Sequence, residues 1–212
     1  MRFGFLIFDG VEELDLLGPW ELVGVWSERF GGPGERLLVA AQPGPARCAK
    51  GLTLTPDVCF DDCPALDVLL VPGGRGTRQV VDDADTIAFI GRCAGQCEAL
   101  LSVCTGAFLL HRAGLLTGQP ATTHWASLDR LHALGDVDVR ETRYTHSGRI
   151  WTSAGVSAGM DMVLAYIADT AGEQTAGEVQ RWAEYYPDDR RYGDAHRANE
   201  LPAYIKDFKD EE

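Results

Sequence analysis

The chain has 212 residues, of which 45% are hydrophobic and 24% are charged, a balance typical of a globular protein with one domain of generous size. It carries 32 Asp and Glu against 19 Lys and Arg, so its formal net charge is −13. This acid excess argues against binding to nucleic acid or to an anionic membrane surface, because both require a basic footprint. No apolar run approaches the roughly 18–20 residues of a membrane span. The N-terminus also lacks a signal-peptide cleavage site, so we expect a cytoplasmic protein.

The first half of the chain alternates between strand and helix signals. In chain order, we predict a buried strand over residues 2–8, a helix over 18–30, a strand over 36–42, a Gly-centred hairpin over 46–58, and a buried strand within 65–74 that ends in a Gly-Gly turn. The strands are continuous apolar runs, typical of strands buried on both faces. Pro19 suits the first turn of the helix, because a proline there loses no hydrogen bond.

The second half repeats this alternation. We predict a helix over 86–99, a strand over 99–104 that runs directly into a helix over 105–116, a strand-to-helix unit that begins at 121–125, two strands joined by a Ser-Gly turn within 137–155, and a helix over 157–172. Repeated β-then-α units predict an α/β fold with a doubly wound, mostly parallel sheet and helices on both faces. In that architecture ligands bind at the carboxyl ends of the strands.

The composition changes at Pro187, because 13 of the last 26 residues are charged. We therefore divide the chain into a domain over residues 1–187 and a charged C-terminal tail over residues 188–212. A solvated tail is our interpretation, and a partner-binding segment is the alternative.

The six cysteines are Cys48, Cys59, Cys63, Cys93, Cys97 and Cys104. A chain of this length with a full core and no export signal does not need a disulfide framework, so we expect free thiols. No pair shows the CxxC or His-rich spacing of a zinc site, and no Gly-rich phosphate loop follows the first strand. We therefore expect neither a metal ion nor a nucleotide cofactor.

Cys104 differs from the other cysteines in its position. It ends an apolar strand and is followed at once by Thr105, Gly106 and a predicted helix. At such a sharp turn the side chain points out of the sheet, and the N-terminus of the helix stabilises a thiolate. Two interpretations remain open at this point: a nucleophile, or a small buried cysteine that ends a strand.

The segment VPGG ends a neighbouring predicted strand at the same edge of the sheet. Gly73 and Gly74 allow the backbone to approach a ligand closely. A free N–H of Gly74 would provide an oxyanion site beside Cys104. The alternative is an ordinary tight turn.

Two side chains are candidates for proton transfer. Most acids after the first strand are expected to be solvated or to cap a helix, but Asp15 lies between leucines, and an apolar setting would bury its carboxyl group and raise its pKa. His124 is a candidate base for Cys104, with a structural role as the alternative. Position 105 is Thr rather than His, and the sequence pattern points to no Asn or Asp as the partner of a distant His. We therefore do not expect a catalytic triad like that of cysteine proteases.

Together these motifs resemble the ThiJ/PfpI superfamily, which has a flavodoxin-like fold and a cysteine at a nucleophile elbow. The matching stretches include LDLLGP, VPGG, SVCTG, TTHW and SAGVSAG, and the resemblance covers roughly residues 2–187. All of these except VPGG narrow the resemblance to a branch shared by isocyanide hydratases and by the sensing domains of AraC-type regulators.

The resemblance implies roles for particular residues. The nucleophile of the family corresponds to Cys104, its acidic partner to Asp15, the residue after the nucleophile to Thr105, and the glycine donor to Gly74. A homodimer with the site near the subunit boundary, and the use of no cofactor, are also implied.

The activity that the resemblance implies is hydration of a small apolar isocyanide to an N-substituted formamide. Cys104 would attack the terminal carbon, while Asp15 would donate a proton as a thioimidate forms and then activate water. The predicted substrate-binding residues are Gly73, Gly74, Val156 and His124. Apolar residues near LDLLGPW would join Val156 in facing the apolar group of the substrate.

Two other functions remain open. A free-standing sensor of a small metabolite would match the sensing domains of AraC-type regulators, although the basic helix-turn-helix domain of those regulators does not match the acidic tail of this chain. We therefore expect no binding to nucleic acid. Glyoxalase or deglycase activity on small oxo-aldehydes also requires only a cysteine and an acid.

Overall fold

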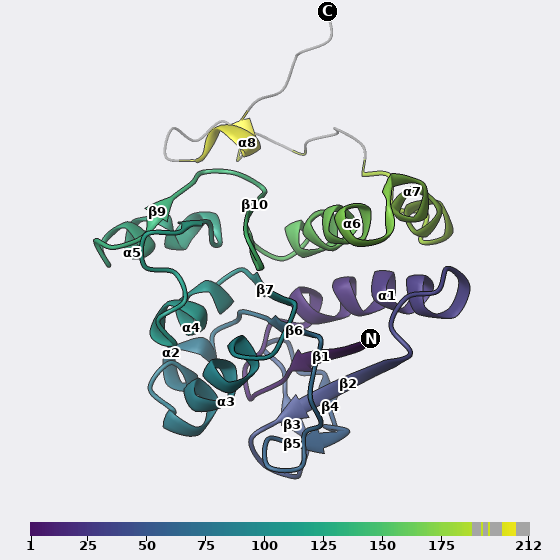
Figure 1. The fold of residues 1–212 in the computed structure, drawn as a ribbon. Helices are drawn as coiled ribbons and strands as arrows, with labels where there is room; N and C mark the ends of the chain where they lie inside the picture. Colours follow the sequence, from purple (N-terminus) through teal and green to yellow (C-terminus); the bar gives the residue numbers. More distant parts are fainter. Residues whose placement is uncertain (188–191, 193–194, 196–200, 207–212) are drawn as a thin grey trace, which may run out of the picture.

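The computed structural model describes residues 1–187, 192, 195 and 201–206. Its centre is a seven-stranded sheet with the strand order β10-β11-β7-β6-β1-β2-β5 (Figure 1). The strands are β1 (Arg2–Leu6), β2 (Glu35–Ala40), β5 (Val58–Cys59), β6 (Val68–Val71), β7 (Ala99–Val103), β10 (Tyr144–Ser147) and β11 (Ile150–Ser153). All neighbours pair in parallel except β10, which pairs antiparallel with β11 at one edge.

Helices cover both faces of this sheet (Figure 1). One face carries α1 (Glu13–Arg29), α6 (Ala158–Ala171) and α7 (Glu173–Trp182), and the other carries α2 (Thr77–Val80), α3 (Ala84–Ala94) and α4 (Gly106–Arg112). The predicted α/β architecture with helices on both faces is therefore confirmed.

Each central strand contributes to two hydrophobic cores. In β1, Phe3 and Phe5 pack on the side of α1 and α6, whereas Leu6 packs on the side of α3 and α4. In β6, Leu70 joins the first core and Leu69 the second. Alternate side chains of a strand point to opposite faces, so a strand between two helical layers must be apolar throughout. This requirement explains the continuous apolar runs in the sequence.

Helix α1 begins earlier than the sequence predicts. It starts at Glu13, so Glu13 and Asp15 occupy its first turn, and Pro19 lies inside the helix rather than in its first turn. Acidic side chains stabilise the first turn, because the N-terminus of a helix carries partial positive charge. Pro19 removes only the hydrogen bond that would reach the carbonyl of Asp15. The earlier start places Asp15 on the helix.

The smaller elements differ more from the prediction. The predicted hairpin is present, with β3 (Ala46–Arg47) paired antiparallel to β4 (Thr53–Leu54). The strand-to-helix unit predicted to begin at 121–125 is present, but its strand lies outside the main sheet. There, β8 (Pro120–Ala121) pairs with β9 (Asp138–Val139) in a separate two-stranded sheet, followed by the 3-10 helix Trp125–Ser127 and by α5 (Leu128–His132).

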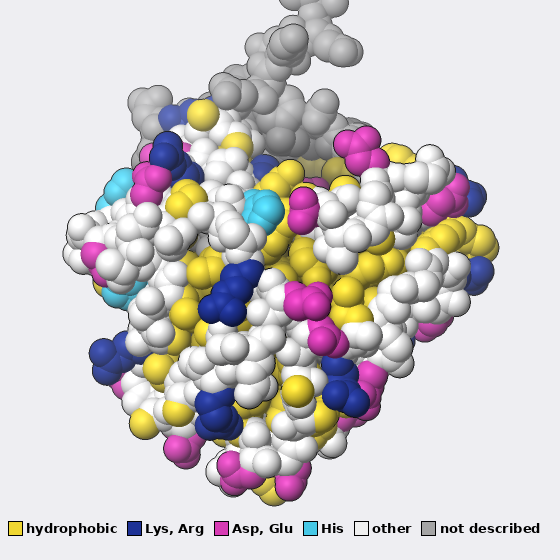
Figure 2. Space-filling view, viewed as in Figure 1, with side chains coloured by type: hydrophobic (Ala, Val, Ile, Leu, Met, Phe, Trp, Pro, Cys, Tyr) yellow, Lys and Arg dark blue, Asp and Glu magenta, His cyan; other side chains and the backbone are white. Residues whose placement is uncertain are grey.

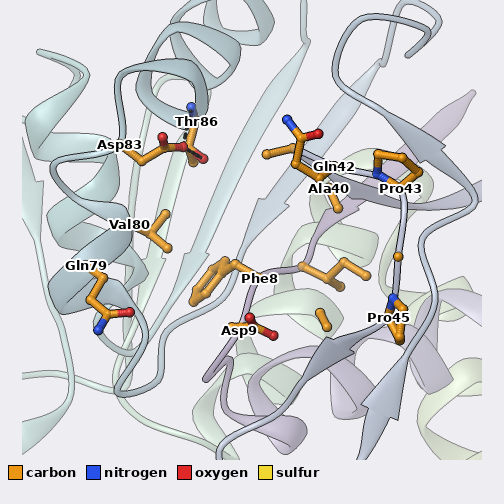
Figure 3. Close-up of a pocket in the computed structure, with 14 residues that line it drawn as sticks. Phe8, Asp9, Ala40, Gln42, Pro43, Pro45, Gln79, Val80, Asp83 and Thr86 are labelled. Carbon is orange, nitrogen blue, oxygen red and sulfur yellow. Dashed lines mark hydrogen bonds between the residues drawn. The ribbon is translucent and has the colours of Figure 1, made fainter.

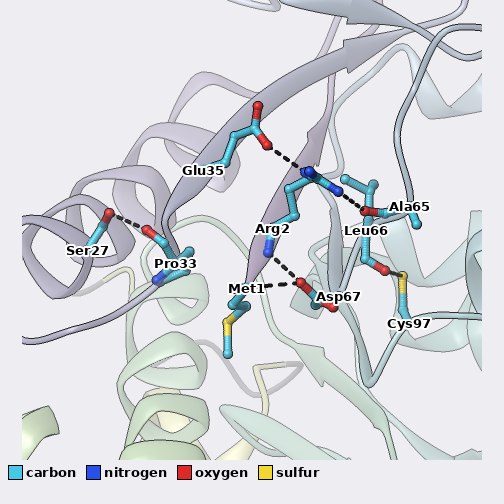
Figure 4. A network of polar contacts seen from close by, with 9 residues as sticks. All are labelled: Met1, Arg2, Ser27, Pro33, Glu35, Ala65, Leu66, Asp67 and Cys97. Carbon is cyan, nitrogen blue, oxygen red and sulfur yellow. Dashed lines mark hydrogen bonds and ion pairs between the residues drawn. The ribbon is translucent and has the colours of Figure 1, made fainter.

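Arg2 fastens the first strand at the amino-terminal edge of the sheet (Figure 4). Its backbone N–H donates to Asp67 Oδ2 at 2.5 Å, and its side chain donates to Glu35 Oε2 and to the carbonyl oxygen of Ala65. These contacts join β1 to β2 and to the segment before β6. The opposite, carboxyl-terminal edge is left for the loops that follow β1, β6 and β7.

The face in Figure 2 carries acidic and basic side chains interspersed with hydrophobic surface. In the described part of the chain, no helix combines the length and the apolar character needed to cross a membrane. Most of the predicted tail over residues 188–212 lies outside the described residues, although α8 (Ala203–Lys206) belongs to it.

Candidate active site

Cys104 lies between the end of β7 and the start of α4. Its φ of 58° falls in the left-handed region that residues with a side chain rarely adopt. Hydrogen bonds hold this backbone on both sides: the N–H of Cys104 donates to the carbonyl oxygens of Ser153 and Ala154, and Thr123 Oγ1 donates to the carbonyl oxygen of Cys104 at 2.7 Å. Strained backbone that its surroundings enforce is typical of functional sites. The structure thus contains the sharp strand-to-helix turn that the sequence predicts.

Two glycines let neighbouring backbones approach this turn. A Cβ atom at Gly106 would lie 2.1 Å from the carbonyl oxygen of Val71, and a Cβ atom at Gly73 would lie 2.5 Å from the backbone nitrogen of Thr105. Both of these neighbours are main-chain atoms, which cannot move aside as the end of a flexible side chain could. The loops after β6 and β7 are therefore in contact only because glycine occupies both positions.

We expect Gly106→Ala to destabilise the fold by about 1–3 kcal/mol, because the added methyl group would overlap the carbonyl oxygen of Val71. The matched control is Gly91→Ala in α3, where no atom lies within 4 Å of the added Cβ. There alanine should stabilise by up to about 1 kcal/mol, since glycine is the poorer helix former. Urea unfolding followed by circular dichroism gives both values. A Gly106→Ala variant as stable as Gly91→Ala would contradict this packing.

Asp15 is completely buried on the first turn of α1. Its Oδ2 accepts a hydrogen bond from the N–H of Gly73 at 2.9 Å, its Oδ1 accepts one from the N–H of Val156 at 3.1 Å, and the thiol of Cys104 donates to the carboxyl group. Burial raises the pKa of Asp15 to about 7, the charge of Glu12 adds to this increase, and the hydrogen bonds oppose it. The carboxyl group is therefore close to half-protonated at neutral pH.

The surroundings of Cys104 oppose the thiolate character that the strand-to-helix turn predicts. Burial raises its pKa above the ordinary value, the negative charge of Asp15 raises it further, and hydrogen bonds from the N–H and the hydroxyl group of Thr105 lower it. Burial outweighs any stabilisation by the short helix α4, because a charged sulfur loses its hydration. The thiol keeps its proton until another group accepts it, and Asp15 is the group in contact with it.

Thr105 connects the turn at Cys104 to the turn after β6. Its Oγ1 accepts hydrogen bonds from the N–H of Gly74 and from Thr77 Oγ1, both at 3.0 Å. Thr77 Oγ1 also lies 2.8 Å from the carbonyl oxygen of Gly74. The N–H of Gly74 is therefore engaged by Thr105 and is not the free oxyanion donor that the sequence suggests. Gly74 fixes Thr105, which in turn contacts the sulfur.

His124 lines the same cavity as Cys104, but no hydrogen bond joins the two among the described residues. Its Nδ1 accepts a hydrogen bond from the N–H of Ala126 at 3.2 Å, and a Cβ atom at Gly155 would lie 2.1 Å from its ring. Burial lowers the pKa of His124 and favours the neutral ring. The ring forms part of the cavity wall, and its environment does not activate it as a base for Cys104.

A cavity of about 400 Å³ opens beside Cys104, within the size range of sites for small molecules. It is lined by Glu12, Lys50, Gly74, Arg75, Thr77, Arg78, Cys104, Thr105, His124, Ala126, Ser127, Arg130 and Val156. Most of the predicted site residues thus meet in one place. Asp15 and Gly73 lie behind this wall, where they contact Cys104 and one another.

The apolar residues of LDLLGPW do not line the cavity, although the sequence places them against the substrate. Leu16 is completely buried in the core, and Leu14 faces outward with 39% of its surface exposed. Val156 does line the cavity, and its φ of 55° directs its N–H toward Asp15. Sequence reasoning missed the charged residues of the wall, because they come from four separate segments of the chain.

Other hollows of the surface lie away from Cys104. One of about 370 Å³ lies at the carboxyl ends of β1 and β2, with Phe8, Gln42 and Val80 around it (Figure 3). The described residues contain no group of three or more His, Cys, Asp or Glu side chains arranged to hold a metal ion. Each of the six cysteines is a free thiol.

Fold and site together define a class of protein: an α/β domain with a cysteine on a strained strand-to-helix turn and a buried carboxyl group in contact with its thiol. The model of the DJ-1/PfpI family matches residues 1–169. The chain belongs to the DJ-1/PfpI family, which confirms the resemblance found in the sequence motifs.

Individual relatives place the chain within this family. It is 39% identical to the isonitrile hydratase of Pseudomonas putida over 187 residues, which cover 88% of this chain and 79% of that enzyme. It is 30% identical to the HTH-type transcriptional regulator GbdR of Pseudomonas aeruginosa over 86% of this chain, but it spans only 50% of that regulator. The crystal structure of a THiJ/PfpI family protein from Pseudomonas syringae matches with a TM-score of 0.84 at 32% identity, covering 97% of this chain and 82% of that one.

Proposed function

We propose that the chain is an isonitrile hydratase, which adds water to an isocyanide to give an N-substituted formamide. The observation that carries this proposal is the contact between the thiol of Cys104 and the carboxyl group of Asp15, whose pKa is about 7. A carboxyl group with a pKa near neutrality can accept and return a proton within one cycle. The reaction requires this, because a thiol proton must move to the substrate carbon. The identity with the enzyme of Pseudomonas putida supports the same activity.

The first half of the reaction joins Cys104 to the substrate. A bond forms between Sγ and the terminal carbon of the isocyanide while the thiol proton passes to the carboxylate of Asp15. Asp15 then gives this proton to the same carbon, and the product is a neutral thioimidate, R–N=CH–S–Cys. The raised pKa of the thiol is compatible with this step, because the proton leaves as the new bond forms.

The second half releases the product. Asp15, again a carboxylate, removes a proton from water as the oxygen attacks the thioimidate carbon, and it passes this proton to the nitrogen. The tetrahedral adduct then forms C=O and breaks its C–S bond, and the hydroxyl proton returns to sulfur. One isocyanide and one water have become one formamide, and no further co-reactant is needed. Thr105 positions the sulfur, while Val156 and Ala126 contact an apolar portion of the substrate.

We also propose that residues 1–187 are the catalytic domain, that residues 188–212 are an appended tail, and that the active form is a cytoplasmic homodimer. Exposed large hydrophobic side chains support the homodimer, since such surface is commonly covered by a partner. They include Leu14, Trp125, Trp182 and Tyr186, which are 39–63% exposed. Leu14 adjoins Asp15 and Trp125 adjoins His124, so a partner that covered them would border the site.

The test of this function gives the purified protein an alkyl isocyanide and, in a parallel reaction, methylglyoxal. We expect N-alkylformamide from the first, measured by mass spectrometry, and no lactate from the second. Lactate without formamide would establish glyoxalase activity instead. Binding of the isocyanide with no turnover of either compound would indicate a sensor, in keeping with the identity to part of the transcriptional regulator GbdR.

A further inference from the structure

Positive charge is concentrated around the cavity at Cys104. Lys50, Arg75, Arg78 and Arg130 line it, against a single carboxylate, that of Glu12. The chain as a whole has a net charge of −13, so the sign at this cavity is opposite to that of the protein. If the charged residues of this cavity reflected the composition of the whole chain, acidic residues would outnumber basic ones.

The acid at the cavity does not neutralise the arginines. Glu12 is paired with the ammonium group of Lys50. In the described part of the chain, Arg75 and Arg78 form no ion pair and no side-chain hydrogen bond. Arg130 lies over the ring of Phe108, with its Cζ 4.6 Å from the ring centre. This contact orients the guanidinium group, and no carboxylate of the described residues forms an ion pair with it.

The backbone between Arg75 and Arg78 is fixed in place. The N–H of Gly76 donates to the carbonyl oxygen of Gly10 at 3.0 Å, and a Cβ atom at Gly76 would lie 2.0 Å from the carbonyl oxygen of Asp9. The segment is thus held against the loop after β1. Both arginines are exposed and also line an adjoining hollow of about 440 Å³, together with Asp9 and Arg47, so they stand at the mouth of the cavity rather than at its base.

We propose, on the basis of the proposed function, that the substrate is an isocyanide that carries a carboxylate. Arg75 and Arg78 bind this carboxylate at the mouth of the cavity while the isocyanide carbon reaches Cys104. Guanidinium groups suit this role, because their paired N–H groups match the two oxygens of a carboxylate. Like charges repel one another, and a bound anion relieves that repulsion.

The first experiment compares isocyanoacetate with its ethyl ester, which presents the same isocyanide without the charge. We expect kcat/KM for isocyanoacetate to exceed that for the ester by about tenfold or more, the effect of one charge-assisted hydrogen bond. The preference should shrink as ionic strength rises, because salt screens exposed charges. Equal values for the two substrates in low salt would overturn the proposal while leaving the hydratase activity established.

The variant Arg75→Gln/Arg78→Gln tests the residues themselves. We expect the ratio of the two kcat/KM values, anionic over neutral, to fall about tenfold in this variant. Arg92→Gln/Arg181→Gln is the matched control: it removes two positive charges from α3 and α7, outside the cavity, and should keep the wild-type ratio. A ratio that falls equally in both variants would show that only the net charge matters, and would contradict a binding site.

A chemical probe separates this proposal from the proposed function. Iodoacetate and iodoacetamide alkylate thiols at the same carbon and differ in charge, and peptide mass spectrometry reports the modification of Cys104 alone. We expect the ratio of the two rates, iodoacetate over iodoacetamide, to fall about fivefold or more in Arg75→Gln/Arg78→Gln. An unchanged ratio would overturn the anion site. If neither isocyanide is hydrated, the proposed function fails and this ratio still decides whether the site binds anions.

Discussion

Replacing Cys104 with alanine is expected to lower kcat/KM for isocyanide hydration by about 10²-fold or more. The variant retains the cavity and Asp15 but has no atom that can form the thioimidate, so water would have to attack the isocyanide directly. Formation of the formamide, followed by mass spectrometry, measures the loss. Electrospray mass spectrometry of the wild-type protein under turnover should show the mass of one isocyanide added at Cys104.

Cys93→Ala is the matched control for this loss. Cys93 is also a buried thiol, but it lies on α3 and does not line the cavity. If Cys93→Ala lost as much activity as Cys104→Ala, the effect would be one of folding rather than of chemistry. Hydration by Cys104→Ala within about tenfold of the wild-type rate would exclude a covalent mechanism.

The substitution Asp15→Asn is expected to cost about 10²-fold or more in kcat/KM, because an amide cannot carry the proton from the thiol to the substrate carbon. The wild-type enzyme should also show a limb in its pH profile. Since the free enzyme needs Asp15 as a carboxylate, and its pKa is about 7, kcat/KM should rise with pH through about 7 and then level off. In Asp15→Asn this limb should disappear.

Glu12→Gln provides the control for Asp15. Glu12 lines the cavity, and its charge contributes to the raised pKa of Asp15. Removing that charge should therefore move the limb to lower pH without abolishing it. An Asp15→Asn enzyme that kept the limb near pH 7 would assign the titration to another group and remove Asp15 from the mechanism.

The central sheet could be predicted because its strands are buried on both faces. β1, β6 and β7 must be apolar along their whole length to contact both cores, and such runs are visible without tertiary information. The turn at Cys104 was predictable for a related reason, since the strand ends at the cysteine and Gly106 follows two residues later. Where local sequence determined the structure, prediction and structure agree.

Other features depend on contacts between distant segments. The start of α1 at Glu13 is not marked by a capping side chain. The two residues of β8, Pro120 and Ala121, pair with Asp138 and Val139 of β9, which follow only after the intervening helices. The helix α7 was not predicted, because it follows α6 after a single glycine and has only a narrow apolar face. In each of these cases packing against the rest of the protein decides the structure.

The electrostatics of the site were the property least predictable from the sequence. The apolar neighbours of Asp15 predicted its burial, but the raised pKa of Cys104 follows from burial by several segments together and from the proximity of Asp15. The engagement of Gly74 by Thr105 depends on two turns that come together in space. The cations of the cavity wall are dispersed along the chain from Lys50 to Arg130, so no local motif reveals them.

Asp15 accepts its hydrogen bonds from Gly73 and Val156, which lie 58 and 141 residues further along the chain. Its environment therefore exists only when these distant loops are assembled. The native protein holds a proton on Asp15 up to about pH 7, whereas an opened chain releases it near the ordinary value of 3.8. Because folding raises this pKa, the stability linked to the proton is complete below about pH 4 and is lost as the pH rises through about 7. Local opening of the loops around Asp15 is thus coupled to the release of one proton. This opening becomes easier over the same pH range in which Asp15 becomes a base.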